Sequence, residues 1–209
     1  MSQVQRFQVL LAGIFSQIIC IGIARFSYTP LLPVMQQQSW IGDIEGGWLA
    51  AVNYAGYMAG ALLAASLSDL KLKDTLYRIG LILAVVTTVL MALTENFWLW
   101  AILRFLSGLS SAGSMLIASG LILNWLIRHG HRSELGIHFA GVGIGIMVAA
   151  LFVELMLQVG QNWQQQWLWF GALATLLAIP AWRWLPRPAA VAVQGSAQQM
   201  QDIPPTRKF

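Results

Sequence analysis

Long apolar runs follow one another along the chain, separated by short polar gaps. A helix needs about 20 consecutive apolar residues to cross the hydrocarbon core of a bilayer. Windows of that length predict six spans, at about residues 7–34, 46–68, 76–94, 97–127, 135–158 and 165–185. The pattern therefore predicts an all-α integral membrane protein, with a six-transmembrane-helix bundle over residues 1–186. Residues 187–209, rich in Pro, Ala, Gln and Ser, are expected to form a flexible cytoplasmic tail or a truncated central linker.

Basic residues are distributed unevenly among the polar gaps. They occur before the first predicted span, between the second and third (Lys71, Lys73 and Arg78), between the fourth and fifth, and after the sixth. The other gaps contain no Lys or Arg. Because cytoplasmic loops are enriched in these residues, the pattern predicts that both termini are cytoplasmic. The tryptophans fall near predicted span ends, as expected of residues at a membrane interface.

Composition agrees with this prediction. The chain is 57% hydrophobic and only 10% charged, whereas a soluble domain carries about 25% charged residues. The net charge of +4 does not indicate nucleic-acid binding, because the basic residues are spread over short gaps that orient the protein in the bilayer. Cys20 is the only cysteine, which excludes an intrachain disulfide and a cysteine pair for a metal. We expect no cofactor and no metal.

Polar side chains inside the predicted spans are the candidates for function. Arg25 and Arg104 are the two basic residues that membrane orientation leaves unexplained, and an ionisable residue within a span is costly. On a helical wheel Arg25 shares one polar stripe with Tyr28. Pro30 and Pro33 are expected to kink or end this first helix. The residues predicted to line a substrate or proton pathway are Arg25, Tyr28, Asn53, Tyr57, Arg104 and Glu154.

Each charged candidate also has a structural interpretation. Arg25 could cap a shorter first span and extend its side chain to the headgroups, or it could form a structural ion pair. Arg104 could tether backbone carbonyls or pair with Glu154, and Glu154 could be solvated at the end of its helix. His138, one turn into the fifth predicted span, is a minor candidate for a proton relay.

Glycines recur at a spacing of four residues in two predicted spans. Gly56 precedes Gly60, and Gly141 precedes Gly145. Small residues at this spacing allow helix backbones to approach closely in a membrane. We therefore expect these four glycines, together with Gly108 in the fourth span, to lie at helix contacts.

Three stretches resemble motifs of the major facilitator superfamily of transporters. Residues 104–112, Arg-Phe-Leu-Ser-Gly-Leu-Ser-Ser-Ala, resemble its fourth-span motif. Residues 141–150 are similar to its glycine-rich fifth-span motif, although the usual proline is missing. The stretch Asp69-Leu-Lys71-Leu-Lys73-Asp74 is similar to its signature loop but lacks the glycines and paired arginines. The resemblance implies a gating contact between the two halves at this loop. The missing glycines and arginines make the support for this contact weak.

Residues 24–35, 53–57 and 59–63 are similar to the bacterial YbfB/YjiJ-type group of that superfamily, and the resemblance covers residues 7–187. It implies one half of a two-half transporter, with a 3+3 inverted repeat, in the bacterial inner membrane. Such a protein moves a small organic solute, possibly with protons, by alternating access. The opposite half is absent here, so the resemblance implies either a truncated chain, which the abrupt end at Pro204-Pro205 favours, or two copies that assemble.

An intramembrane hydrolase and a non-transporting membrane subunit are the two alternatives to a transporter. An intramembrane hydrolase of the rhomboid type needs serine in a Gly-x-Ser-Gly setting, but Ser119-Gly120 follows Ile117-Ala118. We therefore expect no catalytic residue and no enzyme. A non-transporting remnant or accessory membrane subunit stays open as the alternative. The expected surroundings are the lipid bilayer, a small-molecule solute and a second half or second copy, without nucleic acid.

Overall fold

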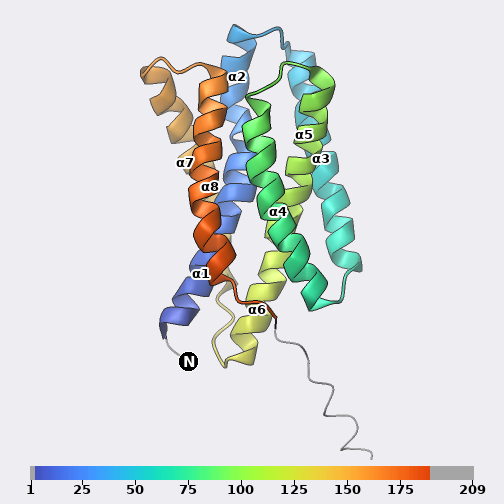
Figure 1. Cartoon of the computed structure of the whole chain (residues 1–209), viewed down its shortest axis with the longest axis vertical. Helices are drawn as coiled ribbons and strands as arrows, with labels where there is room; N and C mark the ends of the chain where they lie inside the picture. Colours follow the sequence, from blue (N-terminus) through green and yellow to red (C-terminus); the bar gives the residue numbers. More distant parts are fainter. Residues whose placement is uncertain (1–2, 189–209) are drawn as a thin grey trace, which may run out of the picture.

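The computed structural model describes residues 3–188, which form long helices joined by short loops, with no strand (Figure 1). The first helical segment is continuous through α1, the π-helix η1 and α2, and the fourth is continuous through α5, the π-helix η2 and α6. The first and last described residues lie at the same end of the bundle. The elements are α1 (Gln3–Gln17), η1 (Ile18–Phe26), α2 (Tyr28–Gln38), α3 (Asp43–Ser66), α4 (Leu70–Met91), α5 (Phe97–Ala112), η2 (Gly113–Ala118), α6 (Ser119–Arg128), α7 (Leu135–Gln158) and α8 (Trp163–Trp184).

Five of these segments are long and apolar enough to cross a membrane: Gln3–Gln38, Asp43–Ser66, Leu70–Met91, Phe97–Arg128 and Leu135–Gln158. The predicted class, an all-helical membrane bundle, is confirmed. The 22-residue helix α8 is not in that group, and it begins with three consecutive glutamines after Trp163. Six spans and the 3+3 inverted repeat therefore stay predictions. Most of the predicted tail, residues 189–209, lies outside the described residues.

Local sequence signals set the ends of several helices. Asn96 caps α5, because its side-chain oxygen accepts hydrogen bonds from the backbone N–H groups of Trp98 and Leu99. Asn162 caps α8 in a reciprocal capping box with Gln165. Such caps satisfy N–H groups that have no acceptor within the helix. The connections between the helices are short, and neighbouring segments run antiparallel (Figure 1).

The first helix does not end at its prolines, contrary to one of the two expected outcomes. It continues through Pro33 to Gln38. Pro30 lies near the start of α2, shortly after the end of η1. The irregular winding precedes the prolines, at η1. π-Helical segments inside longer helices are frequent at functional sites, and Arg25 lies in the last turn of this one.

Helices α3 and α5 are in backbone contact through glycine. A Cβ atom added to Gly56 would lie 2.0 Å from the carbonyl oxygen of Phe105, and one added to Gly108 would lie 2.0 Å from that of Asn53. A Cβ on Gly60 would lie 2.7 Å from that of Ala112. Only glycine fits at the two 2.0 Å positions without a shift of the backbone, which holds α3 and α5 in a fixed register.

The contact between the first helix and α7 is built in the same way. A Cβ atom added to Gly145 would lie 3.0 Å from the Cα atom of Gly22, and one added to Gly22 would lie 2.5 Å from that of Gly145. A Cβ on Gly141 would lie 2.8 Å from the carbonyl oxygen of Ile14. Gly22 was not among the predicted packing glycines, because its partner lies on another helix and shares no sequence spacing with it.

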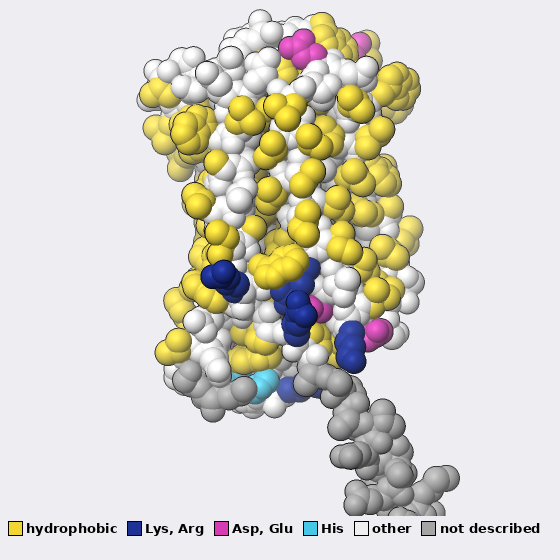
Figure 2. Space-filling model, viewed as in Figure 1, with side chains coloured by type: hydrophobic (Ala, Val, Ile, Leu, Met, Phe, Trp, Pro, Cys, Tyr) yellow, Lys and Arg dark blue, Asp and Glu magenta, His cyan; other side chains and the backbone are white. Residues whose placement is uncertain are grey.

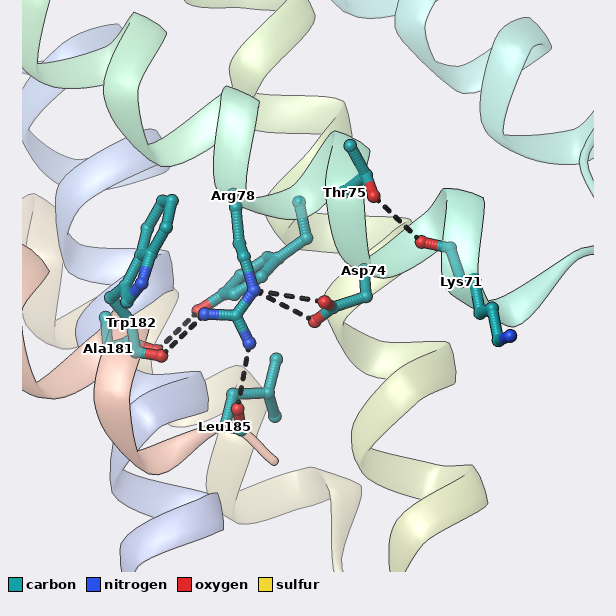
Figure 3. A network of polar contacts seen from close by, with 8 residues as sticks. Lys71, Asp74, Thr75, Arg78, Ala181, Trp182 and Leu185 are labelled. Atoms are coloured by element: carbon teal, nitrogen blue, oxygen red, sulfur yellow. Dashed lines mark hydrogen bonds and ion pairs between the residues drawn. The ribbon is translucent and has the colours of Figure 1, made fainter. Parts of the chain in front are cut away.

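A buried ion pair anchors the end of α8 (Figure 3). The Arg78 Nε atom donates to both carboxylate oxygens of Asp74, at 3.2 and 3.0 Å. Its Nη1 and Nη2 atoms donate to the carbonyl oxygens of Trp182 and Leu185, at 2.8 and 3.1 Å. These carbonyls lie in the last turn of α8 and just after it, where intrahelical donors run out. Arg78 was predicted to lie in a polar gap, but it is inside α4 and 7% exposed.

Candidate functional site

The guanidinium group of Arg25 lies among three aromatic rings. Its central carbon is 4.3 Å from the ring centroid of Tyr57, 4.8 Å from that of Tyr54 and 5.2 Å from that of Phe26. These are cation–π distances, and they bring together residues of η1 and α3. The side chain is half-buried. Within residues 3–188 it forms no ion pair, and its Nε atom has no hydrogen-bond partner.

Arg104 holds the backbone that carries Arg25. Its Nη1 atom donates to the carbonyl oxygen of Ala24 at 3.1 Å, and its Nη2 atom donates to that of Arg25 at 3.2 Å. The guanidinium carbon also lies 4.3 Å from the ring centroid of Tyr28. Arg104 is 3% exposed, so its charge lies inside the bundle rather than at a headgroup. Among the residues that the structure describes, the contacts of Arg104 are to carbonyls and a ring, with no carboxylate.

Tyr28 and Asn53 connect this region to the neighbouring helices. The Tyr28 hydroxyl donates to the carbonyl oxygen of Gly46 at 3.0 Å. The Asn53 side-chain amide donates to the carbonyl oxygen of Arg104 at 2.8 Å and to the Ser107 hydroxyl at 2.7 Å. Tyr28 and Asn53 are 2% and 1% exposed, so in this conformation they position the arginines and are not free to contact a solute.

Glu154 does not join the other predicted pathway residues. It is exposed on α7, and its carboxylate accepts a hydrogen bond from the Gln158 side chain at 3.3 Å. It forms no ion pair with either arginine in the part of the chain that the structure describes. The structure thus groups Arg25, Tyr28, Asn53, Tyr57 and Arg104 and leaves Glu154 apart.

The residues of the predicted signature loop lie at the start of α4. The Asp69 carboxylate accepts a hydrogen bond from the Lys71 backbone N–H at 3.0 Å and so caps the helix. The Lys71 side chain is exposed, and that of Lys73 is half-buried. The gating contact stays a prediction, because it would be made with a second half.

A second polar cluster lies inside the bundle, around His138. The Nε2 atom of this fully buried residue lies 2.8 Å from the Gln17 side-chain nitrogen and 3.0 Å from the Ser119 hydroxyl. The Ser114 hydroxyl donates to the Gln17 side-chain oxygen at 3.3 Å. The cluster joins α1, η2, α6 and α7. His138 was a minor candidate from the sequence, but no local signal paired it with Gln17, since their contact spans 121 positions.

Comparison with known proteins agrees with the helical architecture. Residues 17–208 match the family described as "Uncharacterised MFS-type transporter YbfB". The chain is 32% identical over 98 residues to an uncharacterized MFS-type transporter, YceJ, of Bacillus subtilis, covering 47% of this chain and 25% of that protein. It is 27% identical over 132 residues to the niacin transporter NiaP of Acinetobacter baylyi, covering 62% and 29%.

The benzoate transport protein of Acinetobacter baylyi is 25% identical to the chain over 165 residues, which are 76% of this chain and 35% of that protein. The chain therefore matches between a quarter and about a third of the length of these relatives. The predicted superfamily and group are confirmed by the family match, which covers most of the chain. This multi-pass membrane protein belongs to the YbfB-type family of major facilitator transporters.

Proposed function

We propose that the chain forms one half of a secondary transporter that moves a small organic anion, with Arg25 as the residue that contacts the anionic group. The observation that carries this proposal is the charge of Arg25. It is half-buried, lies on a helix able to cross a membrane and has no carboxylate partner within residues 3–188. A cation in such a place is costly unless it is compensated. A solute carboxylate would provide that compensation.

The surroundings of Arg25 favour a planar solute. Tyr54, Tyr57 and Phe26 lie within cation–π distance of its guanidinium group. Their rings would leave N–H groups at the edge of the guanidinium for two parallel hydrogen bonds to a carboxylate. The Tyr54 ring is 55% exposed and could also contact an aromatic solute. Two relatives are named for the transport of niacin and benzoate, which are both aromatic carboxylates.

Alternating access in this superfamily uses two halves around a site near the bilayer midplane. We infer that a second six-span half, or a second copy of this chain, supplies the opposite wall of the site in the bacterial inner membrane. Lys and Arg side chains gather toward the end of the bundle where both described termini lie (Figure 2). This distribution supports a cytoplasmic position of both termini. Arg104 would hold the Arg25 backbone during transport, and Asp69, Lys71 and Lys73 would contact the second half.

Binding and uptake of benzoate test the proposal. Purified protein is titrated with benzoate and with the neutral analogue benzamide, and proteoliposomes are assayed for benzoate uptake. We expect the protein to bind benzoate but not benzamide. Arg25→Gln should weaken binding by about ten- to a hundredfold, the value of a charged hydrogen bond of about 1.5–3 kcal/mol. Arg25→Lys should have an intermediate effect, because lysine keeps the charge but not the bidentate geometry.

Arg132→Gln is the matched control, since Arg132 is an exposed basic residue in the loop between α6 and α7. Equal binding of benzoate and benzamide, or benzoate binding that Arg25→Gln leaves unchanged, would refute a role of Arg25 in anion recognition. A protein that binds no organic anion and supports no uptake would instead match the alternative, a non-transporting remnant or accessory subunit.

A further inference from the structure

Helices α4 and α8 enclose a groove on the outside of the bundle, on the face shown in Figure 2. Its volume is about 570 Å³, which is within the range of small-molecule sites. Ile82, Val86 and Ile179 in its walls are 52%, 43% and 49% exposed. Because α4 is long and apolar enough to cross a membrane, this groove opens toward lipid. The lining residues are Leu81, Ile82, Val85, Val86, Thr175, Ala178, Ile179, Trp182 and Arg183.

The two helices are in contact beyond both ends of the groove. At one end the Val89 side chain packs directly on Gly171, because a Cβ atom added to Gly171 would lie 2.5 Å from a methyl carbon of Val89. At the other end Arg78 donates to the carbonyl oxygen of Trp182 and so bridges the two helices. The stretch from Thr175 to Arg183 spans about 12 Å at 1.5 Å per residue. The groove thus runs along the helices for a length that suits part of a hydrocarbon chain.

Polarity changes sharply along the groove. Thr175 is the only residue of the lining with a hydroxyl group. This hydroxyl donates to the carbonyl oxygen of Gly171 in the same helix at 2.7 Å, so the walls between the ends of the groove are mostly apolar. Arg183 lies at the end near the last turn of α8 and is exposed. In contrast to Arg78, it has no carboxylate partner within the described part of the chain. An apolar wall that leads to an uncompensated cation matches an acyl chain joined to an anionic headgroup.

We propose that the α4–α8 groove binds an anionic phospholipid, with one acyl chain in the groove and the phosphate at Arg183. The site is separate from Arg25 and does not depend on the proposed solute. A basic residue near the bilayer surface attracts an anionic lipid by about 1 kcal/mol, which corresponds to about fivefold in affinity. The lipid belongs to the leaflet at the C-terminal end of α8, whichever side of the membrane that is.

Native mass spectrometry of the full chain in detergent tests the proposal with two lipids of identical acyl chains, phosphatidylglycerol and phosphatidylcholine. We expect phosphatidylglycerol to bind about fivefold more tightly. Arg183→Gln should abolish this preference, whereas Lys71→Gln, which removes an exposed cation outside the groove, should retain it. Ala178→Phe should reduce binding of both lipids by filling the groove. Leu176→Phe, at a 65% exposed position of α8 outside the lining, should not.

Two results would overturn the proposal. One is an equal affinity for the two lipids in the unmodified protein. The other is a phosphatidylglycerol preference that survives both Arg183→Gln and Ala178→Phe, which would place lipid selection elsewhere on the surface. Each variant is first checked for an unchanged melting temperature, so that a loss of lipid binding reports the groove rather than unfolding.

Discussion

The contact between α3 and α5 yields a sharp prediction through Gly108. Its substitution by alanine adds a Cβ atom only 2.0 Å from the carbonyl oxygen of Asn53, whereas real Cβ atoms essentially never approach a heavy atom within 3.0 Å. The two backbones must therefore separate by about 1 Å or more. That movement would stretch the hydrogen bond from the Asn53 amide to the Arg104 carbonyl, which is 2.8 Å long.

The expected cost combines two effects. Overpacking of a close contact costs about 1–3 kcal/mol, and loss of a buried hydrogen bond adds about 1–3 kcal/mol. A total of about 2–6 kcal/mol lowers the melting temperature of a domain of this size by roughly 4–24 °C, at about 2–4 °C per kcal/mol. The same separation would shift the Arg104 backbone, so solute binding at Arg25 should weaken as well.

The single cysteine makes the measurement direct. Cys20 is 1% exposed, so a fluorogenic maleimide reacts with it only when the bundle opens. Heating the purified protein with the dye gives the melting temperature. Gly143→Ala is the matched control, because Gly143 is a glycine within α7 whose added Cβ would meet nothing within 4 Å. If Gly108→Ala melts at the same temperature as the unmodified protein, the close contact between α3 and α5 is wrong.

Three further substitutions are expected to lower the same melting temperature. Arg78→Leu leaves the buried Asp74 carboxylate unpaired and should lower the free energy of unfolding by about 3–5 kcal/mol. Adding Asp74→Asn should restore part of this loss, and no recovery in the double variant would contradict a pairing role. His138→Leu removes the hydrogen-bond partner of the Gln17 side-chain nitrogen and should lower the free energy of unfolding by about 1–3 kcal/mol. An unchanged melting temperature would mean that the cluster around His138 is not formed. Arg104→Gln should reduce both stability and benzoate binding, and a variant that loses neither would exclude a positioning role for Arg104.

The family and the membrane class could be predicted from sequence because both depend on local patterns. The bilayer requires about 20 apolar residues in succession, and this requirement is visible without knowledge of any contact. An arginine within such a run is conspicuous for the same reason, so Arg25 and Arg104 could be singled out. Glycine spacing likewise identified Gly56 and Gly145 as candidates for close packing, since the spacing is a property of one helix face.

The pairing of these residues depended on how the helices are rotated and shifted against each other. A pairing of Arg104 with Glu154 was one of the structural interpretations, but Glu154 is exposed on α7 while Arg104 donates to carbonyls of η1. The two carbonyl partners of Arg78, at Trp182 and Leu185, lie more than 100 positions away at the end of α8. The π-helical winding of η1, which precedes Pro30, also had no visible local signal.

The sequence alone determined where the chain can enter a membrane and which side chains are costly there, because hydropathy and helical periodicity act over neighbouring residues. Only the tertiary structure decided which costly groups compensate one another, because a hydrogen bond between helices requires both faces at one depth and in one register. That register depends on the close backbone contacts at Gly22, Gly56 and Gly108. It leaves the two Nη atoms of Arg104 donating to carbonyls and Arg25 among aromatic rings, and neither arginine is paired with a carboxylate within residues 3–188.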